Sequence, residues 1–281
     1  MEWIERLNAA INYIEMHLTD EIDPAQLGRI ACCSPYHFQR MFGYMAEQPL
    51  SEYIRRRKMS VAATELQAGS QKVIDIAAKY GYSSPTAFNR AFQAVHGVAP
   101  SAVKKQGATI KSFPPLVFKM TVKGTTEMNY RIETKDEIRI VGVSVPISHN
   151  IEENFQTLPA FWDSTLQDGT VPRLLPMMDG APKGLLGICF CNETEGWRYY
   201  IAVASTQPKG AFEERTIPAA TWAVFSGGGA NTAIQELERR ILTEWLPTSG
   251  YEYGSAPDME VYISPDPQNA KFEVWIPVVK K

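Results

Sequence analysis

The sequence is poor in cysteine: four residues in 281, standing in two close pairs, Cys32/Cys33 and Cys189/Cys191. Cysteines that are adjacent or two residues apart are poor disulfide partners, and no Cys/His set has the spacing of a metal site. The pattern argues against a disulfide framework and against a metal centre. We expect reduced thiols that pack inside the fold, with redox sensing as the alternative.

The sequence also lacks any apolar run of 18 residues, and its start, Met-Glu-Trp-Ile-Glu-Arg, has no basic segment followed by an apolar core. A membrane span needs about 20 apolar residues, and an export signal needs both of those features. We therefore expect a cytoplasmic protein without a membrane partner. With 281 residues, the chain is long enough for two domains with separate cores.

A strong charge of one sign is missing too, since the net charge is −3. The charge is distributed unevenly along the chain. Residues 1–110 carry 12 Lys+Arg and 10 Asp+Glu, whereas residues 111–281 carry 16 Lys+Arg and 21 Asp+Glu. The run 55–58 (Arg-Arg-Arg-Lys) is the densest basic segment. Such groups neutralise phosphates and give DNA affinity that falls with salt. A solvated helix face explains Arg55 equally well, and a structural role between two units is the alternative for Arg57.

A nine-residue segment occurs twice, fifty positions apart. Residues 34–42 are Ser-Pro-Tyr-His-Phe-Gln-Arg-Met-Phe, and residues 84–92 are Ser-Pro-Thr-Ala-Phe-Asn-Arg-Ala-Phe. Each copy predicts a helix, because the serine caps the first backbone N–H groups and proline fits the first turn. The two phenylalanines of each copy are four residues apart and face a core, while Arg40 and Arg90 lie on a different face.

Another helix is predicted before each copy. One runs from Asp23 to about Ala31 and ends in a tight turn at 32–33, and the other covers 73–80 and ends at Gly81, whose backbone is permissive. Two helices joined by a short turn are typical of the helix-turn-helix motif, whose second helix enters the DNA major groove. One such pattern is a weak signal, but two in register indicate DNA binding.

Further residues extend the two units into a longer pattern. It comprises Ile30-Ala31, Ser34 to Phe42, Pro49 to Ile54, Arg57, Ile76-Ala77, Gly81-Tyr82, Ser84, Phe88, Arg90, Phe92 and Gly97-Val98-Ala99-Pro100. Over about residues 5–107 this pattern resembles the DNA-binding region of the AraC/XylS family of transcription regulators. The resemblance implies an all-α domain in which a long helix joins two helix-turn-helix units. Here that region comes first and a different domain follows it.

The two predicted recognition helices carry the candidate base contacts. Arg40 is the first choice, because a guanidinium bonds guanine O6 and N7 together, and Gln39 suits adenine or a phosphate. In the family pattern Pro85 and Ala87 occupy base-contacting positions, so the second helix is expected to sense methyl groups and shape or to hold phosphate. Arg90 has a backbone clamp or an internal ion pair as its alternative. The candidate DNA-binding residues are Ser34, Tyr36, His37, Gln39, Arg40, Arg55, Arg57, Ser84, Thr86, Asn89 and Arg90.

Both recognition helices belong to one chain. Held on one joining helix, they reach major-groove faces about one helical turn, roughly 34 Å, apart. A monomer therefore suffices and the DNA site need not be palindromic, with some bending if the helices lie closer together. We expect double-stranded DNA and RNA polymerase as partners.

The helical pattern ends near residues 106–108, and Phe113-Pro114-Pro115 is stiff and non-helical. We predict a DNA-binding domain over 1–107, a linker over 108–127 and a second domain over 128–281. Within the linker, a strand is predicted over 116–122 and a turn over 123–126.

The second region predicts a strand–helix–strand–strand unit twice, which makes it an α+β domain. The first unit is predicted over 130–146, 151–166, 185–191 and 197–205, and the second over 212–226, 230–246, 259–264 and 272–278. In the second helix Ile234, Leu237 and Ile241 keep helical spacing, and Glu238 is expected on a polar face. The run 227–229 (Gly-Gly-Gly) lacks the Lys-Ser/Thr of a phosphate loop and predicts a turn into that helix.

This duplicated pattern carries a second resemblance. Its clearest elements are Ile140-Val141-Gly142, Phe161-Trp162, Ala223-Val224-Phe225, Asp258 to Tyr262 and Phe272 to Pro277. From about Met128 to Lys281 it is similar to the GyrI-like ligand-binding domain. The resemblance implies a central ligand cleft between the two repeats, which accepts flat or bulky lipophilic molecules, often cations.

The last predicted strand places Glu273 and Trp275 on one of its sides. A carboxylate beside an indole is costly to bury unless a cation or a strong donor meets it, and an amphiphilic cation satisfies both groups. Glu273 is thus the leading ligand residue, with an ion pair to Arg139 or Arg198 as the alternative. The candidate ligand-binding residues are Glu273, Trp275, Trp162, Tyr199, Trp222, Tyr251, Tyr253 and Glu260, and core packing is the alternative for each aromatic.

The expected function is a sequence-specific DNA-binding transcription regulator, an activator, modulated by a lipophilic and often cationic small molecule, without cofactor or metal. One alternative is a GyrI-like hydrolase of reactive cyclopropane-bearing compounds, in which Glu273 and a phenol, Tyr199 or Tyr253, activate water. The other is a DNA-binding regulator whose second domain binds a protein partner.

Overall fold

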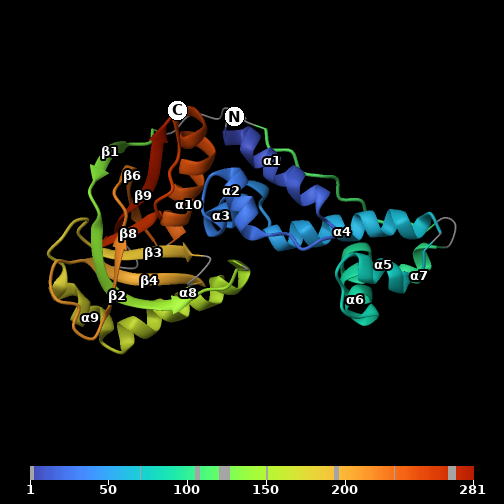
Figure 1. The fold of residues 1–281 in the computed structure, drawn as a ribbon, viewed down its shortest axis with the longest axis horizontal. Coiled ribbons are helices and arrows are strands. Elements are labelled where there is room, and N and C mark those ends of the chain that lie inside the picture. Colours follow the sequence, from blue (N-terminus) through green and yellow to red (C-terminus); the bar gives the residue numbers. More distant parts are fainter. Residues whose placement is uncertain are drawn as a thin grey trace.

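The computed structural model describes residues 3–69, 71–104, 108–119, 127–149, 151–192, 196–230, 232–264 and 270–281. An all-helical region occupies the first part of the chain, and a sheet with helices occupies the second (Figure 1). This confirms the predicted fold class. None of the described helices is long and apolar enough to cross a membrane.

The helical region contains α1 (Trp3–Met16), α2 (Pro24–Ala31), α3 (Pro35–Ala46), α4 (Leu50–Gln67), α5 (Val73–Lys79), α6 (Pro85–His96) and α7 (Pro100–Val103). The pairs α2–α3 and α5–α6 are the two helix-turn-helix units, and α4 joins them (Figure 1).

The start and stop signals of these helices act as the sequence predicts. Ser34 Oγ accepts a hydrogen bond from the His37 N–H at 3.1 Å, and Ser84 Oγ accepts one from the Ala87 N–H at the same distance. Gly81 has φ +82°, which suits a residue without a side chain at the turn between α5 and α6. The phenylalanine pairs of α3 and α6 are fully buried.

The linker differs from its prediction. Residues 116–119 form no strand, and the rest of that predicted strand, with the turn over 123–126, lies outside the described residues. Helix side chains take the backbone hydrogen bonds: the Phe113 N–H donates to Ser60 Oγ at 3.0 Å, and the Phe118 N–H to Asn8 Oδ1 at 2.8 Å. The segment is extended and packs one side on the helices, with Phe118 buried and Val117 exposed.

The second region begins with β1 (Tyr130–Lys135). It continues with β2 (Ile138–Pro146), α8 (Ile151–Gln167), α9 (Thr170–Leu174), a 3₁₀ turn (Leu175–Met177), β3 (Leu185–Asn192), β4 (Gly196–Ala204), β5 (Glu213–Ile217) and β6 (Ala220–Gly229). Then come α10 (Thr232–Arg240), a π-helical segment (Ile241–Trp245), a 3₁₀ turn (Leu246–Thr248), β7 (Tyr251–Tyr253), β8 (Met259–Ser264) and β9 (Ala270–Lys280).

The described strands form one antiparallel sheet in the order β1-β6-β9-β8-β3-β4-β2-β5, with β7 beside β9. Two strands predicted as continuous are each divided, at 136–137 and at 218–219. Because of the break at 136–137, consecutive strands pair at different places in the sheet. β1 pairs with β6, whereas β2 pairs with β4 and β5.

The predicted glycine turn is also corrected. Gly227, Gly228 and Gly229 are the last residues of β6 and pair with β9. The close approach of the Phe272 ring explains the first of them, because a Cβ on Gly227 would lie 2.4 Å from a ring carbon. The three glycines thus continue strand β6, and the first of them lies where the Phe272 ring leaves no room for a side chain.

The two faces of the sheet have different neighbours. On one face Glu260 lies beside Val274 of β9 and Gly187 of β3, and the helices cover this face. On the other, Met259, Val261 and Trp275 belong to a separate buried cluster. Because side chains alternate along a strand, Glu273, which pairs with Val261, points away from the face that carries Glu260.

Candidate functional site

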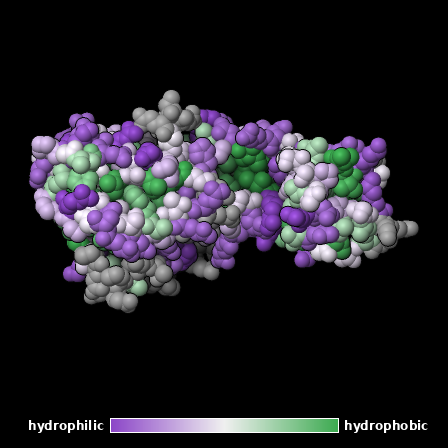
Figure 2. All heavy atoms as spheres, turned by 90° about the horizontal axis from the view of Figure 1, so that it is seen from below, coloured by the Kyte–Doolittle hydropathy of each residue, from purple (hydrophilic) through white to green (hydrophobic). Residues whose placement is uncertain are grey.

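The second helix-turn-helix unit lies far from the sheet. It is carried at the end of α4 as a separate lobe of the molecule (Figures 1 and 2). On α6, Thr86 and Arg90 are exposed, and Asn89 is half-buried, as is the cap residue Ser84. These side chains are placed as a DNA-contacting face requires, and their DNA contacts stay predictions.

The first unit has the opposite environment. Helix α3 packs on the second domain, in contact with α8, α10 and strand β3 (Figure 1), and the surface of these three elements that receives it is named here the groove. Three of the residues expected to face DNA are buried there, with exposed fractions of 4% for Tyr36, 3% for His37 and 6% for Gln39. The prediction that the base-contacting side chains of α3 are exposed is therefore wrong for Tyr36, His37 and Gln39.

Each of these residues has a defined partner in the second domain. Tyr36 packs in a cluster with Trp197 and Tyr199. The His37 ring stacks on Tyr253, with 4.0 Å between ring centroids, and the two side chains share a hydrogen bond of 3.1 Å. Gln39 Nε2 donates to a backbone carbonyl, that of His149, at 2.6 Å.

Arg40 lies at the centre of this interface, with its side chain 14% exposed. Among the described residues three carboxylates surround it: Glu238, Asp258 and Glu260, named here the acidic cluster. The guanidinium forms an ion pair and hydrogen bond with Glu238 and lies 3.3 Å from Glu260 Oε1 and 3.7 Å from Asp258 Oδ2. Tyr44, one helical turn further along α3, donates to Glu238 Oε2 at 2.9 Å.

Aromatic side chains complete the site. Tyr262 donates to Glu260 Oε2 at 2.9 Å, Tyr199 lies 3.5 Å from the same oxygen, and the Trp162 indole N–H donates to the Tyr199 oxygen at 3.0 Å. Gly187 makes room for them, because a Cβ there would lie 2.2 Å from the Tyr199 hydroxyl and 3.2 Å from a Glu260 oxygen. The absence of a side chain at this glycine lets the phenol and the carboxylate meet.

Burial and charge shift the pKa values of the cluster in different directions. Burial and the nearby Glu238 carboxylate raise the pKa of Glu260 to about 7, while Arg40 opposes that rise. Burial works to raise the pKa of Asp258 as well, but the hydrogen bond and charge of His37, together with Arg40, hold it below its usual value. Burial raises the pKa of the Tyr199 and Tyr262 phenols, so both stay protonated donors.

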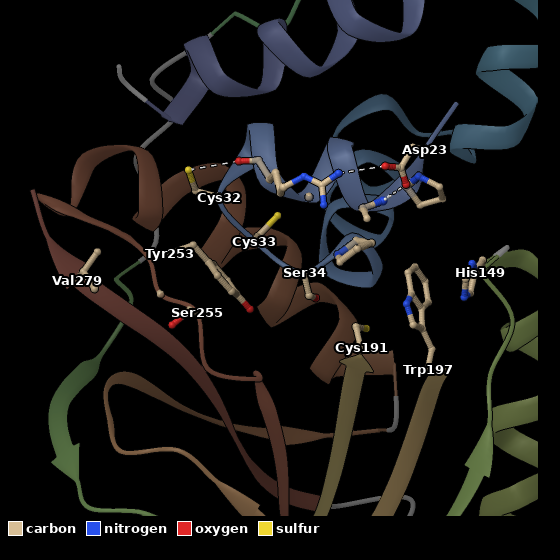
Figure 3. A pocket seen from close by; sticks show the side chains of 16 residues that line it. Asp23, Cys32, Cys33, Ser34, His149, Cys191, Trp197, Tyr253, Ser255 and Val279 are labelled. Carbon is tan, nitrogen blue, oxygen red and sulfur yellow. Dashed lines mark hydrogen bonds and ion pairs between the residues drawn. The ribbon is translucent and has the colours of Figure 1, made fainter. Parts of the chain in front are cut away.

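A cavity of about 750 Å³ opens beside the turn between α2 and α3, where the first unit meets the second domain. Figure 3 shows Cys33 and Ser34 on one side of it and Cys191, Trp197 and Tyr253 on the other. The recognition helix is thus enclosed from Tyr36 to Arg40, whereas the turn that precedes it borders the cavity.

The four cysteines are free thiols that differ in burial: Cys189 is buried, Cys33 and Cys191 are half-buried, and Cys32 is exposed, so the prediction of a packed thiol is wrong for Cys32. Cys189 and Cys191 lie on one face of β3 and pack against the residues that receive Tyr36. Burial raises the pKa of both thiols, that of Cys191 to about 12, so they are poor thiolates. The packing interpretation is favoured over redox sensing.

The leading ligand candidate, Glu273, is not part of this site. It pairs with Arg131 of β1 at 2.8 Å and accepts from the Trp275 indole N–H at 2.9 Å. The structure therefore supports the ion-pair alternative, with Arg131 in place of the expected arginines. Glu273 also lies on the opposite face of the sheet from Tyr199, so the carboxylate–phenol pair of the hydrolase alternative is not assembled.

The remaining candidates divide between the site and the core. Trp162, Tyr199, Tyr253 and Glu260 lie at the interface with α3. By contrast, Trp222 and Trp275 pack against each other on the far face, and Tyr251 stacks on Trp245.

Sequence reasoning missed three residues of the site: Glu238, Asp258 and Tyr262. A signal existed for two of them, because residues 258, 260 and 262 share one side under the period of a strand. Glu238 had been expected on a polar face, and the structure corrects this: it is 4% exposed, because α10 turns it toward Arg40.

The basic residues of α4 also have intramolecular partners. Arg57 is buried, pairs with Glu15 of α1 at 2.7 Å and donates to the Phe113 carbonyl. It ties α4 to α1 and the linker, which fits the structural alternative, and its contact with DNA stays a prediction. Arg55 is exposed and bonds Glu52 of its own helix, which fits the solvated-face alternative, and its contact with phosphate stays a prediction.

Comparison with protein families matches both parts of the chain. Residues 128–279 match the GyrI-like small molecule binding domain, and residues 27–106 match a helix-turn-helix domain.

Relatives match either nearly the whole chain or a part of it. The chain is 23% identical over 282 residues to the Right origin-binding protein of Escherichia coli K12, with 95% of each chain covered. It is 32% identical over 95 residues to the regulatory protein SoxS of Salmonella typhimurium, covering 34% of this chain and 89% of that one. A solved structure described as SAV2435 bound to tetraphenylphosphonium is similar at 23% identity and a TM-score of 0.45, over 54% of this chain and 94% of that one.

The double helix-turn-helix region, the antiparallel sheet domain with its helices, and these matches lead to one conclusion. The chain is a DNA-binding transcription regulator, and its second domain is of the kind that binds small molecules. It belongs to the AraC/XylS family of transcription regulators, with a GyrI-like small-molecule binding domain after its DNA-binding region.

Proposed function

We propose that the groove between α8 and α10 binds a bulky lipophilic cation, and that this cation is the effector of the regulator. The observation that carries the proposal is the acidic cluster, in which three carboxylates surround a single guanidinium. When Arg40 is absent from the groove, the cluster holds buried negative charge that only a cation compensates well.

The walls of the groove suit an organic cation better than a metal ion. Trp162, Tyr199 and Tyr262 surround Glu260 and present ring faces and edges. Aromatic faces attract cations through the ring quadrupole, and they bury the apolar groups that such a cation carries. Glu260 takes the role that the sequence assigned to Glu273.

On the DNA side, we propose that α3 and α6 are the two base-contacting helices. Arg40 and Arg90 are their leading contacts, and the remaining candidates on the two helices support them. Because both helices belong to one chain, a monomer is sufficient for a non-palindromic site. Activation through contact with RNA polymerase belongs to the same proposal.

Calorimetry on the full chain tests the ligand class. Tetraphenylphosphonium is a suitable probe, because it is a bulky aromatic cation, and triphenylphosphine oxide is its neutral counterpart. We expect the cation to bind and the neutral compound to bind much more weakly. Glu260→Gln should lower cation affinity by about tenfold or more, the loss expected when one buried charge partner is removed.

Glu273→Gln is the matched control, since it removes the same charge from the neighbouring strand on the other face. It should leave cation affinity unchanged. Equal losses in the two variants, or equal affinity for the charged and neutral compounds, would contradict the proposed site.

A further inference from the structure

Resting on this proposed function, we infer that Arg40 is an internal competitor of the effector. The chain holds its own first recognition helix in the effector groove, and a cation that takes the place of the guanidinium releases α3 to DNA.

The first step of the argument is steric. Tyr36, His37, Gln39 and Arg40 are the α3 residues expected to contact bases, and the same four side chains are enclosed by the second domain. A major groove about 12 Å wide admits a helix but not a helix covered by another domain. In the closed arrangement of the structure α3 is therefore withheld from DNA.

The second step is chemical. A guanidinium is a planar organic cation, and Arg40 lies over two aromatic rings, 5.7 Å from the centroid of Tyr36 and 6.0 Å from that of Tyr44. Its charge faces the acidic cluster from the position that a cationic ligand would take. A lipophilic cation and Arg40 cannot both fill that position, so the two compete.

The third step concerns the balance between the closed and open states. His37 Nε2 is buried without a hydrogen-bond partner in the part of the chain that the structure describes. The 750 Å³ cavity also borders the turn that leads into α3, at Cys33 and Ser34, so this part of the interface is incompletely packed (Figure 3). A buried unpaired donor or acceptor regains water when the interface opens, which favours release. The ion pairs and apolar contacts around Arg40 oppose release.

The fourth step is the consequence for binding. The second unit stays exposed in the closed state, so α6 remains able to contact DNA while α3 is held. DNA that engages both helices and the cation each bind the open state only. Each must then raise the affinity of the other by the same factor, as linkage requires. The factor is bounded by how strongly the closed state is preferred.

Glu238→Gln separates this mechanism from direct effects on DNA contacts, because Glu238 lies on α10 and, among the described residues, bonds a recognition helix through Arg40 and Tyr44. Affinity for a duplex selected from random DNA by the full chain should rise about tenfold without any cation, a coupling of typical allosteric size. Glu236→Gln is the matched control. It removes one charge from the same helix, where Glu236 is exposed and pairs with Arg239, and should leave DNA affinity unchanged.

Tyr253→Phe gives a second measurement should Glu238→Gln not fold. It removes only the hydroxyl that bonds His37 and leaves the acidic cluster intact. A smaller rise in DNA affinity is expected, about fivefold, for one lost hydrogen bond. In footprinting, the wild-type chain should protect one half of the selected site, and tetraphenylphosphonium should extend protection to the other half, about one helical turn away.

The outcomes distinguish the inference from the function on which it rests. If the cation binds but DNA affinity and footprint do not change, and Glu238→Gln equals Glu236→Gln, the internal competition is wrong while the ligand site stands. If no cation binds but Glu238→Gln and Tyr253→Phe still raise DNA affinity, the ligand class is wrong while the restraint on α3 stands.

Discussion

The two helix-turn-helix units share their sequence pattern and their local structure but not their surroundings. Both recognition helices begin with a serine cap and a proline, and both bury two phenylalanines. Yet α3 is enclosed by the second domain, and α6 is exposed at the far end of α4 (Figure 1). One motif thus occurs here in a restrained and in a free form within one chain.

The residues on the outer face of each recognition helix explain why α3, and not α6, packs against the second domain. Tyr36 and His37 supply large rings with polar ends, which pack between aromatic side chains and still form hydrogen bonds. Their counterparts in the second copy, Thr86 and Ala87, offer little surface to bury. The repeat therefore conserves what forms the helix and varies what the helix contacts.

The joining helix contributes distance. With 18 residues at about 1.5 Å each, α4 is about 27 Å long, so it carries the second unit beyond the reach of the sheet domain. The second unit therefore stays away from the sheet domain although the first unit packs on it.

The largest expected difference between the units is in stability. Arg40→Ala leaves the acidic cluster buried without its cation, which should lower the free energy of unfolding by about 3–5 kcal/mol. Arg90→Ala, at the equivalent position of an exposed helix, should change it by less than about 0.5 kcal/mol. Urea denaturation of the two variants measures both values, and equal losses would show that Arg40 is not paired in solution.

Stability should also depend on pH through the docked unit. The pKa of Glu260 is about 7 in the folded chain, above the usual value of about 4.3 in an unfolded one. The folded state therefore keeps a proton that the unfolded chain has lost, and stability falls as the pH rises from about 4.5 through 7. The titratable groups that interact with Glu260 are Arg40, Glu238, Tyr199, Tyr262, Tyr36 and Cys189.

The expected loss over that range is roughly 3 kcal/mol, from 1.36 kcal/mol for each unit of pKa shift. Denaturation at pH 5 and at pH 8 measures it in the wild-type chain. Glu260→Gln should make the profile flatter by that amount, and an unchanged slope would remove Glu260 as its source.

The next largest expected difference between the two units is their contribution to DNA sequence discrimination. In the Glu238→Gln background, where α3 is free, adding Arg40→Ala should cost about 1–3 kcal/mol for the selected site and relax its sequence preference. Adding Arg90→Ala should cost less, because its helix offers fewer base-contacting side chains. Binding to site variants measures both, and a loss that is uniform over all sequences would show that Arg40 contacts phosphate alone.

The smallest effect should be the same in both units. Ser34→Ala and Ser84→Ala each remove one capping hydrogen bond of 3.1 Å, so each should cost about 1 kcal/mol. Thermal denaturation compares them. A much larger cost at Ser34 would mean that docking depends on its hydroxyl as well as on the ring and guanidinium contacts.

Much of the architecture follows from local patterns in the sequence. The serine caps, the glycine turn at 81 and the spacing of the phenylalanines identify the helices, and two repeated patterns identify the two domains. Strand prediction from the sequence is wrong at 136–137 and 218–219, where a predicted continuous strand is divided into two strands with different neighbours in the sheet. Pairing with distant strands leaves no local signal in the sequence.

The choice of site carboxylate shows the same limit. Glu260 and Glu273 stand on neighbouring strands in similar sequence surroundings. Strand alternation shows that each has a preferred side but cannot say which side meets the helices. The pairing of Val261 with Glu273 fixes that choice and places the two carboxylates on opposite faces.

By itself the sequence determined that two capped helices carry an arginine at the same position, since caps, turns and helical spacing are local properties. Only the tertiary structure decided that one of these arginines meets the acidic cluster, because residues 198 to 220 positions away supply all three of its carboxylates. Long-range charge pairing of this kind depends on how two domains pack, and no short segment encodes it.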